Sequence, residues 1–380
     1  MDKQPVNIHE SRILITGAAG FIGYYLTKRI LTEFPDATVT GIDNMNDYYD
    51  PALKEWRLED LCRIAGQPAP AGAVSDRAAD AAVEAGLSRS SRFTFVRGSI
   101  ADKEIVNDIF TDLKPQIVVN LAAQAGVRYS IENPDAYVES NLIGFYNILE
   151  ACRHDEALEH LVYASSSSVY GGNKKVPFST DDNVDHPVSL YAATKKSNEL
   201  LAHCYSKLYN IPSTGLRFFT VYGPAGRPDM AYFSFTKKLV AGQNIDIFNF
   251  GNCKRDFTYV DDIVEGVLRV MGKAPAKACG EDGLPVPPYA VYNIGGGRPE
   301  NLMDFVHILG EELIRAGVLP QDFDIDAHLN LVPMQPGDVP VTYADSEGLA
   351  RDYGFTPGID LRTGLSRFAE WYAEYYKGGL

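Results

Sequence analysis

The 380-residue sequence has no excess of basic residues, few cysteines and no long apolar run. Lysine and arginine number 35 against 50 acidic residues, a net charge of −15, which argues against a general nucleic-acid binder because such a protein needs a basic surface. The five cysteines form no CxxC pair, so we expect neither a disulfide framework nor a metal site. No stretch of about 18 apolar residues occurs, and the first ten residues are polar. We therefore expect a cytoplasmic protein without a membrane segment.

Short β-branched runs alternate with stretches of helical period from residue 12 to residue 220, as in βαβ units that build a parallel sheet. The predicted strands are residues 13–16, 38–42, 93–96, 117–121, 160–164 and 212–218. They are apolar at nearly every position, which indicates that helices cover both faces of the sheet. The sequence thus predicts an α/β fold with a Rossmann-type doubly wound parallel sheet.

The rhythm loosens beyond residue 222, where strands such as residues 246–250 are isolated and helices such as residues 302–316 stand between long loops. We predict a nucleotide-binding domain over residues 1–222 and a smaller α/β C-terminal domain that binds substrate over residues 223–380, with some exchange of chain between them. Residues 65–91 are rich in Ala, Gly, Pro and Ser and are predicted to be a surface insertion.

A glycine pattern follows the first predicted strand directly. Gly17 permits a tight turn, Gly20 lets the backbone approach a pyrophosphate, and Gly23 lets the following helix pack closely. A glycine triplet alone can be an ordinary turn, but Asp43 ends the next strand twenty residues beyond Gly23, where its carboxylate can hold ribose hydroxyls. This acid would repel the 2′-phosphate of NADP, so NAD is the predicted cofactor.

Tyr191 and Lys195 open the helix after a serine-rich strand end. They are four residues apart, so they project from one face, where the ammonium favours the phenolate. Such a tyrosinate can take a proton from a sugar hydroxyl while the carbon transfers hydride to nicotinamide, and a serine can steady the same oxygen. A Tyr/Lys pair is also common on solvated helix faces. The order of glycine turn, acid, Ala122-Ala123, serine run and Tyr/Lys pair at successive strand ends favours the catalytic interpretation.

From residue 12 onward the sequence resembles the extended short-chain dehydrogenase/reductase family, the sugar-nucleotide epimerases and dehydratases. Residues 43–49, 122–130 and 226–230 are similar to stretches of UDP-glucuronate 4-epimerases. The resemblance implies that Tyr191 is the base, that Lys195 holds the nicotinamide ribose and that Ser166 is the third catalytic residue. The implied NAD-binding set is Gly17, Ala19, Gly20, Phe21, Ile22, Asp43, Asn44, Ser99, Ile100, Leu121, Ala122, Ala123, Gln124, Asn141, Tyr191, Lys195 and Phe218. The implied substrate-binding set is Arg128, Ser166, Ser167, Ser168, Tyr191, Thr220, Arg227, Arg255 and Asp338.

The serine run distinguishes among reactions of this family. Related dehydratases carry an Asp-Glu pair just before Val-Tyr-Gly, and UDP-glucuronate decarboxylases carry Glu there, whereas this chain has Ser167 and Ser168. Elimination of water needs an additional acid and base. The resemblance therefore implies a 4-epimerase that interconverts UDP-glucuronate and UDP-galacturonate by oxidation at C4, rotation of the 4-keto sugar and hydride return. Because the intermediate is a β-keto acid, the hydroxyls of Ser167, Ser168 and Thr220 are candidates to hold its carboxylate against loss of carbon dioxide.

The UDP anchor is expected in the second domain. Arg255 lies in a stretch that resembles the family's Arg-Asp-aromatic motif, and its guanidinium fork fits a diphosphate; Arg227 is a second candidate. Galactose epimerases usually carry Arg two residues before Gly-Asp, but this chain has Gln335 before Gly337-Asp338, which again favours the glucuronate subgroup. Ser99 also departs from relatives, which commonly have Asp near the adenine.

Three alternatives stay open at this point: a UDP-glucose/UDP-galactose 4-epimerase, a UDP-glucuronate decarboxylase, and a non-catalytic module that binds NAD. The resemblance further implies a homodimer formed through helices predicted at residues 134–154 and 191–209, and a role in polysaccharide biosynthesis.

Overall fold

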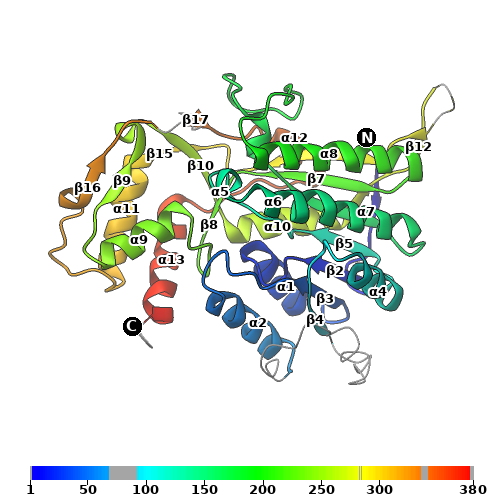
Figure 1. Cartoon of the computed structure of the whole chain (residues 1–380), viewed down its shortest axis with the longest axis horizontal. Helices are drawn as coiled ribbons and strands as arrows, with labels where there is room; N and C mark the ends of the chain where they lie inside the picture. Colours follow the sequence, from blue (N-terminus) through cyan, green and yellow to red (C-terminus); the bar gives the residue numbers. More distant parts are fainter. Residues whose placement is uncertain (1, 68–91, 282, 284, 335–340, 377–380) are drawn as a thin grey trace. The chain divides into compact units, whose positions relative to one another are not determined.

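Runs of apolar, mostly β-branched residues form the central sheet of the computed structural model, which describes residues 2–67, 92–281, 283, 285–334 and 341–376 (Figure 1). In spatial order the seven strands are β14 (Tyr289–Ile294), β7 (Ser213–Phe218), β6 (His160–Ser166), β5 (Ile117–Asn120), β2 (Arg12–Thr16), β3 (Thr38–Asp43) and β4 (Phe93–Arg97). The pairs from β4 through β6 are parallel. Strand order reverses between β2 and β5, which makes that edge the switch point where such sheets bind ligands.

Helices cover both faces of this sheet. They are α1 (Phe21–Glu33), α2 (Ala52–Ile64), α4 (Lys103–Leu113), α7 (Gly144–His154), α8 (Leu190–Tyr209) and α10 (Val260–Met271). One face carries a core in which Leu14 and Val118 of the strands join Phe110 of α4 and Phe145 of α7. Side chains alternate along a strand, and the neighbours of these strand residues, such as Ile13 and Val119, are equally buried on the other face. The doubly wound α/β fold predicted from the sequence is therefore confirmed.

Smaller elements complete this part of the chain. Between β5 and α7 lie α5 (Tyr129–Glu132), α6 (Pro134–Tyr137) and a π-helical turn, η1 (Val138–Ile143). A 3₁₀ turn, η2 (Ser167–Tyr170), follows β6. Two short antiparallel pairs join β1 (Lys3–Pro5) to β11 (Lys273–Pro275) and β12 (Ala278–Cys279) to β13 (Pro285–Val286).

The second part of the chain has its own small sheets. Strand β10 (Lys254–Tyr259) pairs with β8 (Thr220–Tyr222), β15 (Pro299–Asn301) and β17 (Val341–Thr342), and β9 (Ile245–Ile247) pairs with β16 (Leu329–Leu331). The helices are α9 (Ala231–Val240), α11 (Leu302–Arg315), α12 (Glu347–Tyr353) and α13 (Leu361–Tyr376), with short turns η3 (Phe248–Gly251) and η4 (Asp326–His328). The predicted strand at 246–250 is wrong beyond Ile247, because Asn249 and Phe250 have φ near +50° and cannot continue a strand.

The backbone forms two units. The first contains residues 1–173, 183–217 and 264–292, and the second contains residues 174–182, 218–263 and 293–380. The domain division at residue 222 stays a prediction; unlike that division, the observed units assign residues 264–292 to the first. Most of the predicted insertion at 65–91 lies outside the described residues, and α2 ends just before it at Ile64.

Candidate functional site

The glycine turn joins β2 to α1. Gly17 has φ of +72°, and a Cβ there would lie 2.8 Å from the backbone nitrogen of Ala122. A Cβ on Gly23 would lie 2.1 Å from the carbonyl oxygen of Gly17, so only glycine lets α1 pack this close to the turn. Gly20 is the N-cap and has no side chain to cap the helix. The turn therefore offers the backbone N–H groups at the start of α1 to an anion, which fits the pyrophosphate of a dinucleotide.

Asp43 ends β3 at the same edge of the sheet and is only 7% exposed. Its Oδ1 accepts a hydrogen bond from the backbone nitrogen of Met45 at 2.9 Å and lies 3.5 Å from the ammonium of Lys54. The same ammonium donates to Asn46 at 2.8 Å, while Asn44 is exposed. The carboxylate is thus fixed in place at the strand end, as a ligand for ribose hydroxyls requires.

The residues after β5 are held by a network that the sequence did not reveal. Thr16 donates to the Asn120 side chain at 2.8 Å, and its hydroxyl accepts from the backbone nitrogen of Ala122 at 3.0 Å. The Asn141 amide, 1% exposed, accepts from the backbone nitrogen of Gln124 at 2.8 Å and donates to the hydroxyl of Thr194 at 3.0 Å. Asn141, predicted to bind NAD, therefore ties the strand end to α8; its contact with the cofactor stays a prediction.

The predicted residues after β4 are placed differently from one another. Ile100 is 4% exposed and belongs to the core cluster, where its side chain packs on Gly144. Ser99 is half-buried, and its hydroxyl accepts from the backbone nitrogen of Ala101 at 3.1 Å. Ile100 can therefore offer a ligand its backbone, whereas Ser99 lacks the charge of the Asp found in relatives.

The serine segment, residues 165–170, carries the predicted catalytic Ser166 at the end of β6. Ser166 is 9% exposed and caps the 3₁₀ turn, because its hydroxyl accepts from the backbone nitrogen of Ser168 at 3.2 Å. The hydroxyl of Ser168 donates to the same oxygen at 2.9 Å. The two hydroxyls form a short chain in which Ser166 accepts twice and keeps its own proton for a third partner.

Tyr191 and Lys195 lie in the first turns of α8, which Ser189 caps by accepting from the backbone nitrogen of Ala192 at 3.1 Å. The Tyr191 ring is half-buried and meets the ring of Tyr137 edge-on at 6.0 Å. Lys195 is 3% exposed, and its ammonium donates to the carbonyl oxygen of Ala164 at 2.8 Å. Burial lowers the pKa of Lys195 to about 8. This bond joins α8 to β6 two residues before Ser166.

The predicted substrate residues of the second unit are less enclosed. Thr220 of β8 pairs with Phe257 of β10, two residues beyond Arg255, so Thr220 and Arg255 belong to one small sheet. Arg255 is half-buried and donates to the carbonyl oxygen of Lys254 at 3.0 Å. Arg227 forms a forked ion pair with Asp229, with contacts of 3.1 and 2.6 Å. The guanidinium expected on a diphosphate thus already has an anionic partner within its own loop.

The other predicted positions differ in their exposure. Phe218 ends β7 at 9% exposure, whereas Arg128 is exposed at the start of α5. Asp338 lies outside the described residues. Ala19 and Phe21 are buried in the glycine turn, and Ile22, Leu121, Ala122, Ala123 and Ser167 are half-buried.

The sequence interpretation missed several buried charged residues, among them Asp256, Glu199 and Arg217. Asp256 is fully buried in β10 and accepts from the backbone nitrogens of Gly296, Gly297 and Ala344 at 2.7 to 3.0 Å. Burial raises the pKa of Asp256, and these hydrogen bonds oppose the change. Glu199 and Arg217 form a buried ion pair in the first unit. The available signal was a charged residue inside an otherwise apolar strand or helix face.

The described ranges hold no group of three or more His, Cys, Asp or Glu side chains suited to a metal ion. Within the same ranges, no helix has both the length and the apolar character needed to cross a membrane. The glycine turn, the fixed Asp43 and the buried Lys195 all lie in the first unit, at or beside the carboxyl ends of parallel strands, and their chemistry fits a dinucleotide with its pyrophosphate on α1.

The fold and these residues define a Rossmann-type enzyme that depends on a dinucleotide. The chain belongs to the NAD dependent epimerase/dehydratase family, whose model matches residues 13–295. It is 48% identical to Protein CapI of Staphylococcus aureus over 372 residues, covering 96% of this chain and 99% of that one. It is 44% identical to UDP-glucuronate 4-epimerase 4 of Arabidopsis thaliana over 372 residues, covering 96% and 76%. The structure of UDP-glucuronic acid 4-epimerase from Bacillus cereus with UDP-glucuronic acid and NAD is similar, with a TM-score of 0.76, 30% identity and coverage of 96% and 99%.

Proposed function

We propose that the protein is an isomerase, an NAD-dependent 4-epimerase that interconverts UDP-glucuronate and UDP-galacturonate through a transient 4-keto sugar. The similarity to UDP-glucuronate 4-epimerases supports the substrate class. The serine segment supports epimerisation over dehydration or decarboxylation, because Ser167 and Ser168 occupy the positions where those reactions need acidic residues. The hydroxyl of Ser168 bonds Ser166 instead of presenting a carboxylate.

Each predicted residue has a defined task in this reaction. Bound NAD supplies the acceptor for the hydride of C4 and the donor for its return. Tyr191 takes the proton of the C4 hydroxyl, and Ser166 donates a hydrogen bond to the same oxygen. Lys195, fixed by the carbonyl of Ala164, places its positive charge on the same helix face as Tyr191 and favours the phenolate.

The substrate is proposed to be bound by the remaining predicted residues. Arg255 and Arg227 would hold the diphosphate, where a forked guanidinium suits two phosphate oxygens. Ser167, Ser168 and Thr220 would donate to the C5 carboxylate and keep its charge localised, which disfavours loss of carbon dioxide. The sugar can then turn about its diphosphate link while the nucleotide stays bound.

Product analysis tests the proposal. Purified protein is incubated with UDP-glucuronate and, separately, with UDP-glucose, and the nucleotide sugars are identified by chromatography and mass. We expect UDP-galacturonate from the first and little turnover of the second. A UDP-pentose product would identify a decarboxylase, efficient formation of UDP-galactose would identify the hexose epimerase, and no turnover of either sugar would favour a non-catalytic module.

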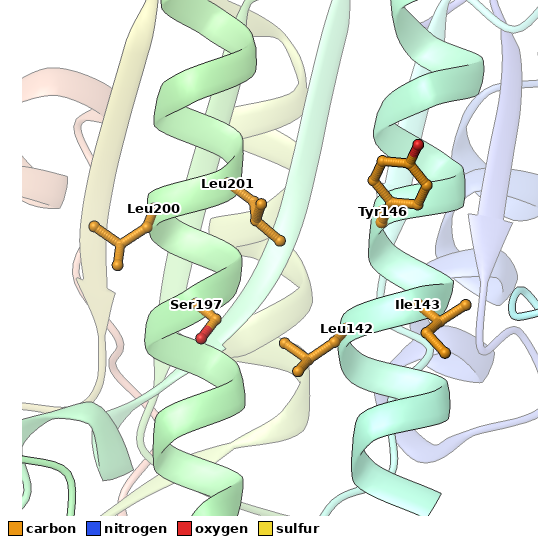
Figure 2. A pocket seen from close by; sticks show the side chains of 6 residues that line it. All are labelled: Leu142, Ile143, Tyr146, Ser197, Leu200 and Leu201. Atoms are coloured by element: carbon orange, nitrogen blue, oxygen red, sulfur yellow. The ribbon is translucent and has the colours of Figure 1, made fainter.

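An apolar surface groove between η1–α7 and α8 supports a homodimer. It is lined by Leu142, Ile143, Tyr146, Ser197, Leu200 and Leu201, which Figure 2 shows on two neighbouring helices. Ile143 is 48% exposed and Leu200 59%, so a second copy that packs the same two helices would remove this apolar surface from water. These helices match those predicted to form the dimer.

We further propose that the enzyme acts in the cytoplasm and serves polysaccharide biosynthesis.

Leu200→Glu tests the dimer. The charge should leave a monomer in sedimentation or light-scattering measurements, because a carboxylate cannot be buried in an apolar interface without a partner. Leu331→Glu is the control, since Leu331 is 51% exposed on the other unit. If both variants keep the mass of the wild type, the groove does not hold a second copy.

A further inference from the structure

Glu199 and Arg217 form an ion pair inside the first unit, and each is only 3% exposed. The guanidinium donates from Nε to one carboxylate oxygen and from Nη2 to the other, both at 2.8 Å. Desolvation of two buried ions offsets much of their attraction, so apolar residues of similar volume would give comparable stability at this place. The pair therefore calls for an explanation other than stability.

The other side-chain hydrogen bonds of the pair go to the serine segment. The hydroxyl of Ser165 donates to Glu199 at 2.6 Å. Arg217 donates from Nη1 to the hydroxyl of Tyr170 at 3.0 Å and lies 4.9 Å from the centre of its ring. Ser165 and Tyr170 are the first and last residues of the segment. One ion pair thus holds both of its ends.

The position of Glu199 on α8 links this clamp to the predicted catalytic residues. Tyr191, Lys195 and Glu199 follow one another at intervals of four residues, so they lie along nearly one face of the helix. Lys195 bonds the carbonyl of Ala164, and Glu199 bonds the next side chain, that of Ser165. Successive side chains of a strand point to opposite sides, so anchoring Ser165 fixes the direction in which Ser166 points.

A second contact reinforces the same register. The hydroxyl of Tyr289 donates to the backbone carbonyl of Glu199 at 3.0 Å and pairs with the hydroxyl of Tyr163 at 2.9 Å. Tyr163 lies two residues before Ser165 on β6, on the same side of the strand. Glu199 is thus joined through both its backbone and its side chain to the strand that ends at Ser166.

We propose that Glu199 and Arg217 are positioning residues that hold the serine segment against α8, so that Ser166 and Tyr191 can both contact the same substrate oxygen. The inference rests on the proposed function for its chemistry. Neither residue needs to touch the substrate. Small displacements of a catalytic group cost rate more than binding, so loss of the clamp should lower kcat about 10- to 100-fold and leave the dissociation constant of NAD unchanged.

Two variants and a control test the proposal. Glu199→Gln removes the charge at nearly constant shape, and Glu199→Leu combined with Arg217→Met replaces the pair with apolar side chains. Asp60→Asn is the control, because Asp60 is a buried carboxylate of the same unit that bonds Tyr24 at 2.6 Å and Lys28 at 3.0 Å, far in sequence from the serine segment. We expect the double variant to regain the Tm lost by Glu199→Gln without regaining kcat, whereas Asp60→Asn should lose Tm and keep kcat.

Hydrogen exchange supplies a readout that does not depend on turnover. Amides of residues 165–170 should exchange faster in both Glu199 variants than in the wild type, while amides of the glycine turn should keep the wild-type rate. In Asp60→Asn, the amides of residues 165–170 should also exchange at the wild-type rate. Recovery of kcat together with Tm in the double variant, or unchanged exchange in the segment, would overturn the positioning role. Rates are measured on whichever UDP-sugar the wild type epimerises. If the wild type is inactive but the variants exchange faster, the proposed function is refuted, whereas the structural role of Glu199 and Arg217 in holding the serine segment is retained.

Discussion

The predicted site residues of the two units are held in different ways. In the first unit, Ser166 and Lys195 are nearly buried and bonded to the backbone of a parallel sheet or of the turn that follows it. In the second unit, Arg227 keeps 24% of its side chain exposed and Arg255 is half-buried near the start of β10. Groups that move protons need fixed geometry, whereas groups that hold a flexible diphosphate can follow it. Variants of the proposed catalytic residues in the first unit should therefore change kcat, and variants of the proposed diphosphate ligands in the second should change KM.

Tyr191→Phe should give the largest effect. The change removes the hydroxyl proposed as the base and keeps the ring against Tyr137, so kcat should fall by about 10³. Binding of NAD, measured by titration calorimetry, should stay within about twofold of the wild type because the glycine turn is untouched. A variant that keeps more than about a tenth of the wild-type rate would show that the proton is taken by another group.

Lys195→Met should separate stability from activity within the first unit. The pKa of Lys195 is about 8 in the folded protein against 10.5 in an unfolded chain, a difference that corresponds to roughly 3 kcal/mol. The folded state therefore favours the neutral lysine, and the penalty for its charge is complete below pH 8 and vanishes above pH 10.5. Removing the ammonium should raise the free energy of unfolding at pH 7 by about 1 to 3 kcal/mol, less the lost hydrogen bond to Ala164.

Urea unfolding at pH 7 and pH 10 measures this effect, with Lys207→Met as the control because Lys207 lies on the same helix and is exposed. The gain in stability should shrink at pH 10, and kcat should be lost at both pH values. An equal gain at the two pH values would mean that Lys195 does not titrate near pH 8.

The sequence predicted the first unit well because its signals are local. The glycine turn and Asp43 each directly follow a predicted strand, and parallel strands bring their carboxyl ends to one edge. The Tyr191/Lys195 pair lies at the start of the helix after β6 and was recognised from its own four-residue spacing. Pairings between distant residues escaped prediction. Glu199 and Arg217 are 18 residues apart, and Asp256 meets Ala344 across 88 residues, so neither contact leaves a spacing that can be read.

The same contrast explains the errors in the second unit. Apart from β10, its strands have two or three residues. The predicted strand at 246–250 stops at Ile247 because the backbone is left-handed at Asn249 and Phe250, and neither residue is a glycine that would have indicated this conformation. Arg227 and Asp229 are only two residues apart in the sequence, but only the structure shows that their side chains form an ion pair.

Asp229→Asn should give the smallest effect and decides whether Arg227 belongs to the site. The ion pair is partly exposed, so its loss should change stability by less than about 1 kcal/mol. If Arg227 binds the diphosphate, the neutral partner competes less for the guanidinium and the KM for the UDP-sugar should fall about twofold to threefold at unchanged kcat. Arg227→Ala should then raise KM, and the double variant should match Arg227→Ala because Asp229 acts only through the arginine. An unchanged KM in all three variants would make Arg227 a surface residue and leave the diphosphate to Arg255.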